Sequence, residues 1–173
     1  YSGGCQGDWT IYIDSDLTEA IASYFGKNTN GHKITIRPTN GTKKTITFNH
    51  SYTSGIPGSI VIGAAQNTNE NSLIKTDNFV IDGSPSDDTS LNLLSIIYSG
   101  SGNHIRVIHV YGDCDNTIIK NCSIINQTSS TLTSAAIAFT ARKVSSVEHI
   151  PDNGLIDNCV LVSAMNSITG SAV

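Results

Sequence analysis

One internal repeat constrains the fold of this 173-residue chain more than any other feature. The segment NTIIKNCSII begins at Asn116, and the similar segment NGLIDNCVLV begins at Asn153, 37 residues later. A shorter copy, NFVIDG, begins at Asn78, which lies 38 residues before Asn116. Similar strand–turn units joined by loops of unequal length are typical of a solenoid, because the stacked strands must keep their register while the loops vary.

The composition agrees with an all-β chain. Charged residues make up 14% of the sequence and hydrophobic residues 38%, and the strong helix former Met occurs once. This excludes a helix bundle. Ten Lys and Arg residues and a net charge of −4 argue against a nucleic-acid groove, which needs clustered cations. No apolar run approaches the roughly 18–20 residues of a membrane span.

Short β-branched runs bounded by Gly, Asn, Asp or Ser predict twelve strands. They are Thr10–Ile13, Lys33–Arg37, Thr45–Phe48, Ser59–Ile62, Phe79–Ile81, Leu93–Tyr98, Ile105–Tyr111, Ile118–Ile119, Ser123–Ile125, Ala135–Phe139, Leu155–Ile156 and Val160–Val162. The one helix signal covers residues 16–25. Asp16 and Glu19 are spaced as a capping box, and the apolar residues that follow share one helical face.

Stacked coils of a parallel β-solenoid lie about 4.8 Å apart, so equivalent residues form ladders. We expect Asn121 and Asn158 to stack at a sharp bend, because Asn tolerates the left-handed conformation and its side chains can hydrogen-bond along the stack. Cys122 and Cys159 then point inward as small hydrophobic side chains. A β-sandwich with two similar strand pairs is the alternative that this pattern leaves open.

The two strand–Asn-Cys–strand units resemble the right-handed parallel β-helix repeat of the pectate-lyase-like superfamily. The longer order of segments is LTEAI at 17–21, ITIRPTNGTKKTITF at 34–48, NFVIDGS at 78–84, HIRVI at 104–108 and NTIIKNCSI at 116–124. This order is similar to that of large secreted β-helix proteins of the Bacteroidota, which are exported by type IX secretion. The resemblance implies an extracellular, cell-surface location.

The resemblance also implies a domain organisation. Residues 1–33 would form an N-terminal strand and the short helix that caps the first coil. Residues 34–173 would form the coils of the β-helix, and we expect them to continue beyond residue 173 in a longer protein. Glycans or cell-surface polymers, and secretion or anchoring proteins, are the partners expected of such a segment.

Three repeat-equivalent residues, Asp82, Lys120 and Asp157, would form an outward-facing charged column. A β-helix lyase uses carboxylates to hold Ca²⁺ and a Lys or Arg as base, and a β-helix hydrolase uses several Asp residues. The charged column is the best candidate for such a cluster, but its pattern is better explained as a solvated ladder of paired charges. The catalytic motifs of the superfamily are not found, so we assign no catalytic residue.

Asp113 and Asp115 form a close carboxylate pair in a segment typical of a turn. They could hold Ca²⁺, or they could cap the turn. Calcium at this pair is the one cofactor that the sequence suggests. The five His residues form no HxH or HExxH pattern, so zinc has no support.

These observations favour a non-catalytic stalk or adhesin that contacts glycans or surfaces. A polysaccharide lyase-like or glycoside hydrolase-like enzyme, with its cleft along the charged column, is the first alternative. A cargo protein of a secretion machine is the second.

Overall fold

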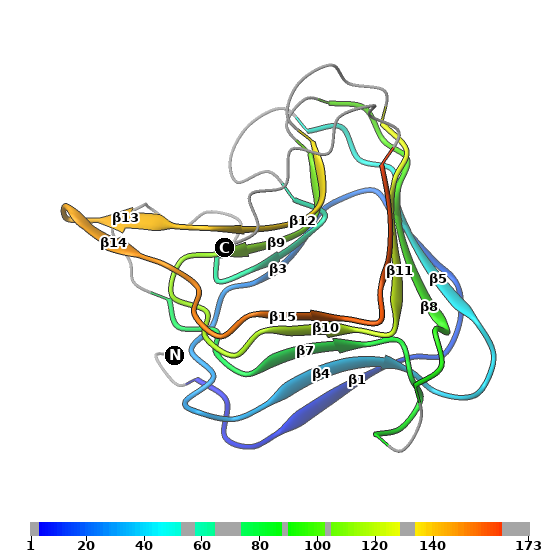
Figure 1. The fold of residues 1–173 in the computed structure, drawn as a ribbon, viewed down its shortest axis with the longest axis horizontal. Coiled ribbons are helices and arrows are strands. Elements are labelled where there is room, and N and C mark those ends of the chain that lie inside the picture. The colour runs from blue at the N-terminus through cyan, green and yellow to red at the C-terminus, as the bar shows by residue number, and fades with distance from the viewer. Residues whose placement is uncertain are drawn as a thin grey trace.

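The computed structural model describes residues 4–52, 58–64, 74–87, 90–102, 105–128 and 134–163. Within these ranges the chain is all-β, with sixteen strands and no helix. Three sheets consist of parallel strands, and the chain visits them in turn, so that successive passes stack on one another (Figure 1). Nowhere in the described residues does a helix reach the length and apolar character that crossing a membrane requires.

Each of the first four passes, or coils, supplies one strand to each sheet, and the described part of the fifth supplies strands to sheets A and B. Sheet A contains β1 (Trp9–Ile13), β4 (Ile34–Pro38), β7 (Phe79–Asp82), β10 (Ile118–Lys120) and β15 (Leu155–Asp157). Sheet B contains β2 (Leu17–Glu19), β5 (Lys44–Phe48), β8 (Leu94–Tyr98), β11 (Cys122–Asn126) and β16 (Val160–Ser163). Sheet C contains β3 (Ser23–Phe25), β6 (Ile60–Ile62), β9 (Arg106–Tyr111) and β12 (Ala135–Thr140). Coil 1 is β1–β3, coil 2 is β4–β6, coil 3 is β7–β9, coil 4 is β10–β12, and coil 5 is β15 and β16.

The strand pairing follows the sequence repeat. Ile118 pairs with Val80 in the coil before it and with Leu155 in the coil after it, which are the offsets of 38 and 37 residues seen in the sequence. One repeat is therefore one coil. The prediction of an all-β fold of stacked parallel strands is confirmed, and each of the twelve predicted strands overlaps an observed one.

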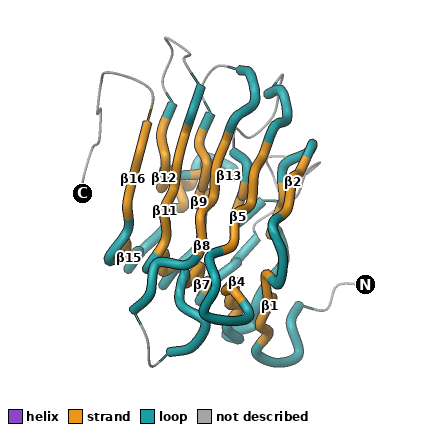
Figure 2. Tube along the Cα trace, turned by 90° about the vertical axis from the view of Figure 1, so that its right-hand side faces the viewer, coloured by secondary structure: helices purple, strands orange, loops and turns teal. Residues whose placement is uncertain are grey.

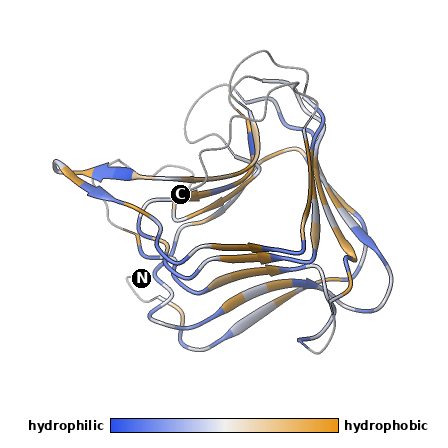
Figure 3. Ribbon diagram, viewed as in Figure 1, coloured by the Kyte–Doolittle hydropathy of each residue, from blue (hydrophilic) through white to orange (hydrophobic). Residues whose placement is uncertain are grey.

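The core is a set of inward-facing ladders that run through the coils. In sheet A, Ile36, Ile81 and Ile119 follow one another in register and are almost completely buried. Ile46, Ile96 and Ile124 form the matching column of sheet B. Figure 3 shows these hydrophobic stretches along the strands of each sheet. Because each aliphatic side chain packs against its equivalents above and below, burial of apolar surface drives the stacking.

The predicted helix over residues 16–25 is wrong: the segment forms β2 and β3 of coil 1. Instead of capping a helix, Asp16 Oδ1 accepts a hydrogen bond from the backbone N–H of Thr45 in coil 2, at 2.8 Å. Leu17 pairs with Ile46, and the ring of Phe25 lies 4.8 Å from that of Phe79. A ten-residue helix is marginal alone, so contacts with the next coil decide the conformation.

No helix covers coil 1 within the residues that the structure describes, and the apolar side chains Trp9 and Ile21 of this coil are 60% and 65% exposed. Figure 2 shows the strands side by side, with β1 and β2 toward one end of the stack and β16 at the other. The predicted coils end at residue 163 in the described part of the chain, and residues 164–173 of the predicted region lie outside it.

An antiparallel hairpin, β13 (Arg142–Val144) and β14 (Val147–His149), interrupts the parallel pattern between coils 4 and 5. It projects from the solenoid (Figure 1). Its two turn residues, Ser145 and Ser146, both have positive φ, of 48° and 72°. Positive φ at both central residues is the geometry of a type I′ turn, whose twist matches that of the flanking strands.

Candidate functional site

The charged column lies where sheet A ends. Pairing of β10 places Lys120 between Asp82 in coil 3 and Asp157 in coil 5, as the repeat predicts. The structure adds a residue that the repeat did not indicate. Arg37 follows Ile36, which pairs with Ile81, so its guanidinium stands in coil 2 next to Asp82.

Asp82 is completely buried, and both of its carboxylate oxygens have polar partners. Oδ1 accepts hydrogen bonds from the Ser84 backbone N–H and from Asn121 Nδ2, each at 2.9 Å. Oδ2 lies 3.2 Å from Lys120 Nζ and 3.4 Å from Arg37 Nη2. A buried carboxylate with this many partners is a structural group, because a substrate would have to displace them to reach it.

The remaining charges of the column are arranged differently. Lys120 pairs with Asp82 rather than with Asp157, which is exposed in coil 5. Arg37 also pairs with Asp87, and the guanidinium lowers the pKa of the Asp87 carboxyl from its ordinary value. The structure therefore brings Asp82 and Lys120 together and leaves Asp157 apart from them.

Asn121 and Asn158 stand one coil apart at the bend between sheets A and B. Both have positive φ, of 54° and 45°, and Asn158 Nδ2 donates a hydrogen bond to Asn121 Oδ1 at 2.8 Å. Because Asn121 Nδ2 also donates to Asp82, the two amides and the carboxylate form one chain across coils 3, 4 and 5. This network fixes the vertical register of three coils at one corner.

The Asn121→Ala variant is expected to have a free energy of unfolding about 3–4 kcal/mol lower than that of the wild type, because it loses two hydrogen bonds and places alanine in the left-handed conformation. Alanine in the left-handed conformation costs roughly 1–2 kcal/mol, and each lost hydrogen bond about 1 kcal/mol. Asn121→Gly loses the same bonds without the conformational cost, so it should lie about 1 kcal/mol closer to the wild type. Urea unfolding of both variants measures the difference; equal destabilisation would show that the left-handed backbone does not matter here.

A second column at the start of sheet A was not singled out from the sequence. An Asp directly precedes the first Asn of each copy of the repeat, which gives the dipeptide Asp-Asn at 77–78, 115–116 and 152–153, and this signal could have revealed the column. Asp77 Oδ1 accepts the Asp115 N–H, and Asp115 Oδ1 accepts the Asp152 N–H, both at 3.0 Å. Asn116 Nδ2 donates to Asn78 Oδ1 at 3.2 Å. Each coil is thus tied to the next at this corner as well.

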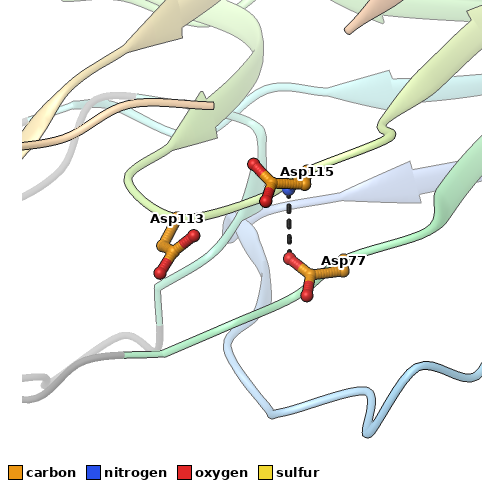
Figure 4. Close-up of side chains that lie close together, drawn as sticks. All are labelled: Asp77, Asp113 and Asp115. Carbon is orange, nitrogen blue, oxygen red and sulfur yellow. Dashed lines mark hydrogen bonds between the residues drawn. The ribbon is translucent and has the colours of Figure 1, made fainter. Parts of the chain in front are cut away.

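Asp77 also joins the predicted pair Asp113 and Asp115, and ligand oxygens of the three carboxylates lie within 4.8 Å of one another (Figure 4). One oxygen of each is already in use. Asp77 and Asp115 accept the backbone bonds described above, and Asp113 Oδ2 lies 3.0 Å from Lys75 Nζ. This pairing raises the pKa of the Lys75 ammonium, which stays charged beside the cluster.

Calcium takes six to eight oxygen ligands. The cluster offers three partly used carboxylates and a neighbouring ammonium, with His149 Nδ1 also 3.7 Å from Asp113. Hydrogen bonds between coils and the Lys75 ion pair account for the arrangement without an ion. We therefore assign it a structural role at the base of the β13–β14 hairpin.

Cys122 is completely buried and Cys159 is partly buried, and both belong to or pack against the core. Their strands are neighbours in register, since Ser123 pairs with Val160. All four cysteines are free thiols. Burial raises the pKa of Cys122 well above its ordinary value, and it raises the pKa of Cys114 to about 12.

These thiols predict an order of chemical labelling. At pH 8 a thiol with a pKa near 12 is thiolate about three orders of magnitude less often than an ordinary cysteine. In the native chain, Cys5 should therefore react first with a disulfide reagent, and Cys114 and Cys122 only after unfolding. Peptide mapping of partly labelled protein measures the order. Labelling of Cys114 as fast as Cys5 without denaturant would contradict the described burial.

No model of a known protein family matches the chain, and no curated protein or solved structure matches it either.

Proposed function

We propose that the chain is a non-catalytic segment of a right-handed parallel β-helix of the pectate-lyase-like type. In this proposal it is displayed on a Bacteroidota cell surface after type IX secretion, and it acts as a stalk or an adhesive surface that contacts glycans. The solenoid of parallel strands and the order of sequence segments described above support the fold and the origin. The local geometry supports the absence of catalysis.

The observation that carries the proposal is the burial of Asp82. A catalytic carboxylate must reach the substrate, either directly or through one water. Asp82 is inaccessible, and its charge is balanced by Lys120 and Arg37. The charged column, which was the best candidate for a lyase or hydrolase cleft, is therefore better explained as a device that holds coils 2, 3 and 4 in register.

The outward face of sheet B supports a contact function. The inward residues of this sheet alternate with a row of hydroxyl side chains, Thr45, Ser95 and Ser123, which pair with one another in register. Thr45 and Ser123 are partly exposed, whereas Ser95 between them is buried. Beside it runs a second row, Thr47, Ile97 and Ile125, whose members are half-buried. Rows of small polar and aliphatic groups on a regular surface suit weak contacts that gain strength by repetition.

The proposal is tested by applying the chain, displayed at high density on a particle, to an array of immobilised glycans. We expect the densely displayed chain to bind, and we expect soluble monomeric chain to be a weak competitor of this binding. The reason is that multivalent display raises the apparent affinity by a factor of about 10²–10⁴. Thr47→Glu on the outward face of sheet B should reduce the binding. Thr10→Glu, the same change on the outward face of sheet A, is the matched control and should not.

The enzymatic alternative is tested on the same protein. Incubation with uronate-containing polysaccharides should give no shortening of the polymer and no unsaturated product. Cleavage that the Asp82→Asn variant abolishes, while the folded state persists, would refute the non-catalytic proposal. Surface display is tested by protease treatment of intact source cells, which should remove the chain from the cell surface if the proposed location holds.

A further inference from the structure

Three Asn-Gly dipeptides, at 30–31, 40–41 and 153–154, differ in how firmly the fold holds them. An Asn-Gly step is chemically weak, because glycine has no side chain and its backbone nitrogen can approach the Cγ atom of the preceding Asn closely. That nitrogen can attack Cγ and displace the side-chain amine. Whether it does so in a folded chain depends on the freedom of the backbone and on the groups that hold the side-chain amide.

The Asn40–Gly41 step lies in the loop between β4 and β5, where residues 39–43 are all exposed. Nothing lies within 4 Å of a Cβ placed at Gly41, and neither residue of the step has a positive φ. Asn40 Oδ1 accepts hydrogen bonds from the backbone N–H and the hydroxyl of Thr42, at 3.1 and 2.5 Å. Neighbouring atoms therefore do not obstruct this backbone, while two donors hold the side-chain carbonyl.

The two donors of Thr42 favour attack on Asn40. Negative charge develops on Oδ1 when the Gly41 nitrogen adds to Cγ. Donors that already point at the atom on which charge develops stabilise such a tetrahedral intermediate. Asn40 Nδ2 has no hydrogen-bond partner within the described residues, so nothing there retains the leaving amine.

The other two steps are held in place. Asn30 Nδ2 donates a hydrogen bond to the Cys5 carbonyl at 3.2 Å, and Asn30 and the glycine after it both have positive φ, of 53° and 82°. Asn153 has a φ of 55°, and Gly154 packs so closely on Phe139 that a Cβ there would lie 2.6 Å from the ring. Each of these steps must leave its packed conformation before the Gly nitrogen can reach Cγ.

We propose that Asn40 is a site of spontaneous modification, at which the chain converts its own asparagine into aspartate and isoaspartate. The Gly41 nitrogen gives up its proton to hydroxide and bonds to Cγ of Asn40. The Cγ–Nδ2 bond breaks, and the amine takes a proton from water and leaves as ammonia. Water then opens the cyclic imide, at Cγ to give aspartate or at the backbone carbonyl carbon to give isoaspartate. The net reaction consumes one water and releases one ammonia.

The conversion adds one negative charge to a loop that also carries Lys43. An aspartate at position 40 keeps a carboxylate oxygen for the two Thr42 donors, whereas isoaspartate adds one atom to the backbone of the loop. Because the loop is exposed, the stacked strands keep their contacts in both products. The inference does not depend on the proposed contact with glycans.

Peptide mapping by mass spectrometry, after incubation of the native chain at mildly alkaline pH, tests the inference. The peptide that contains Asn40 should gain the mass of an amide-to-acid change and split into two products. Asn30 and Asn153 should react at least about tenfold more slowly, which is the factor expected when at least one hydrogen bond or packing contact must break first. In urea, where the fold is lost, the three steps should react at similar rates.

Thr42→Val tests the role of the donors, because it removes the hydroxyl and keeps the backbone N–H. It should slow the reaction of Asn40 by a factor of about three to ten and leave Asn30 unchanged. Thr39→Val is the matched control in the same loop, since the Thr39 hydroxyl donates to the Ile13 carbonyl at 3.4 Å and should not affect the rate. Equal rates at the three steps in the native chain would overturn the inference, as would an unmodified Asn40 under conditions that convert the unfolded chain.

Discussion

Replacing Gly83 with alanine should prevent the chain from folding, or destabilise it by more than about 4 kcal/mol. A Cβ at Gly83 would lie 1.6 Å from the carbonyl oxygen of Asn121 and 3.3 Å from the nitrogen of Cys122. Both atoms belong to the backbone of the next coil. That backbone cannot move away without breaking a hydrogen bond, because the Gly83 N–H donates to the Lys120 carbonyl oxygen at 2.9 Å. Relief requires coils 3 and 4 to separate, and effects of that size are exceptional for one substitution.

Gly41→Ala is the matched control, because nothing lies within 4 Å of a Cβ at Gly41. It should change the free energy of unfolding by less than about 1 kcal/mol, and any gain would come from the reduced entropy of the unfolded chain. Far-UV circular dichroism and urea unfolding of the two variants give the comparison. A Gly83→Ala protein as stable as Gly41→Ala would mean that coils 3 and 4 do not meet at this point.

The Asp82→Asn variant should lose about 3 kcal/mol of stability. The substitution keeps the size of the side chain and removes its charge, so Lys120 and Arg37 remain close together without their carboxylate. Breaking a buried pair by removing one partner typically costs about 3–5 kcal/mol. The lower end is expected here because Lys120 is partly exposed and Arg37 keeps Asp87 as a partner.

Asp157→Asn is the control for this charge effect. Asp157 occupies the same column one coil beyond Lys120 but is exposed, so its loss should change stability by no more than about 0.5 kcal/mol. Urea unfolding at neutral pH measures both variants. Equal effects of the two substitutions would contradict the distinction between a buried network at Asp82 and an exposed end at Asp157.

The repeat allowed the stacking to be predicted because equivalent positions in a solenoid must align. Ile118 and Leu155 pair because neighbouring strands of parallel coils share one register, and an insertion in a loop does not change it. The same reasoning placed Asn121 beside Asn158 and Lys120 between two Asp residues. Wherever two coils have similar sequences, aligning those sequences was enough to predict which of their residues pair.

Prediction failed where a residue's partner lies in a coil of dissimilar sequence. The segment at 16–25 has helical periodicity, but Asp16 and Leu17 are fixed by Thr45 and Ile46 in coil 2. Coil 2 carries no recognisable copy of the sequence repeat, so alignment could not predict these contacts. Arg37 was missed as a partner of Asp82 for the same reason. The contacts that this segment makes with coil 2 outweighed its local helical pattern.

Burial was the second property that alignment could not provide. Repeat-equivalent residues share a register position, yet Asp82 is buried and Asp157 is exposed. The difference arises because Asp82 has coils on both sides, while Asp157 stands in the last described coil. Ser84, which follows Asp82 in the loop to β8, adds a bond that has no counterpart in the repeat. The antiparallel hairpin at 142–149 was likewise outside the repeating pattern.

The stacking of coils in one direction is tested most directly by a distance along the charged column. Tyr12 and Asp157 are 145 residues apart in the sequence but are separated by four steps of the column through Arg37, Asp82 and Lys120. Spin labels on Tyr12→Cys and Asp157→Cys, with the native cysteines replaced by alanine, give this distance by pulsed electron paramagnetic resonance. Four steps of about 4.8 Å predict a narrow distribution centred near about 19 Å, broadened by the label linkers. A distribution centred at more than twice that separation, or one without a defined maximum, would contradict the stacked arrangement.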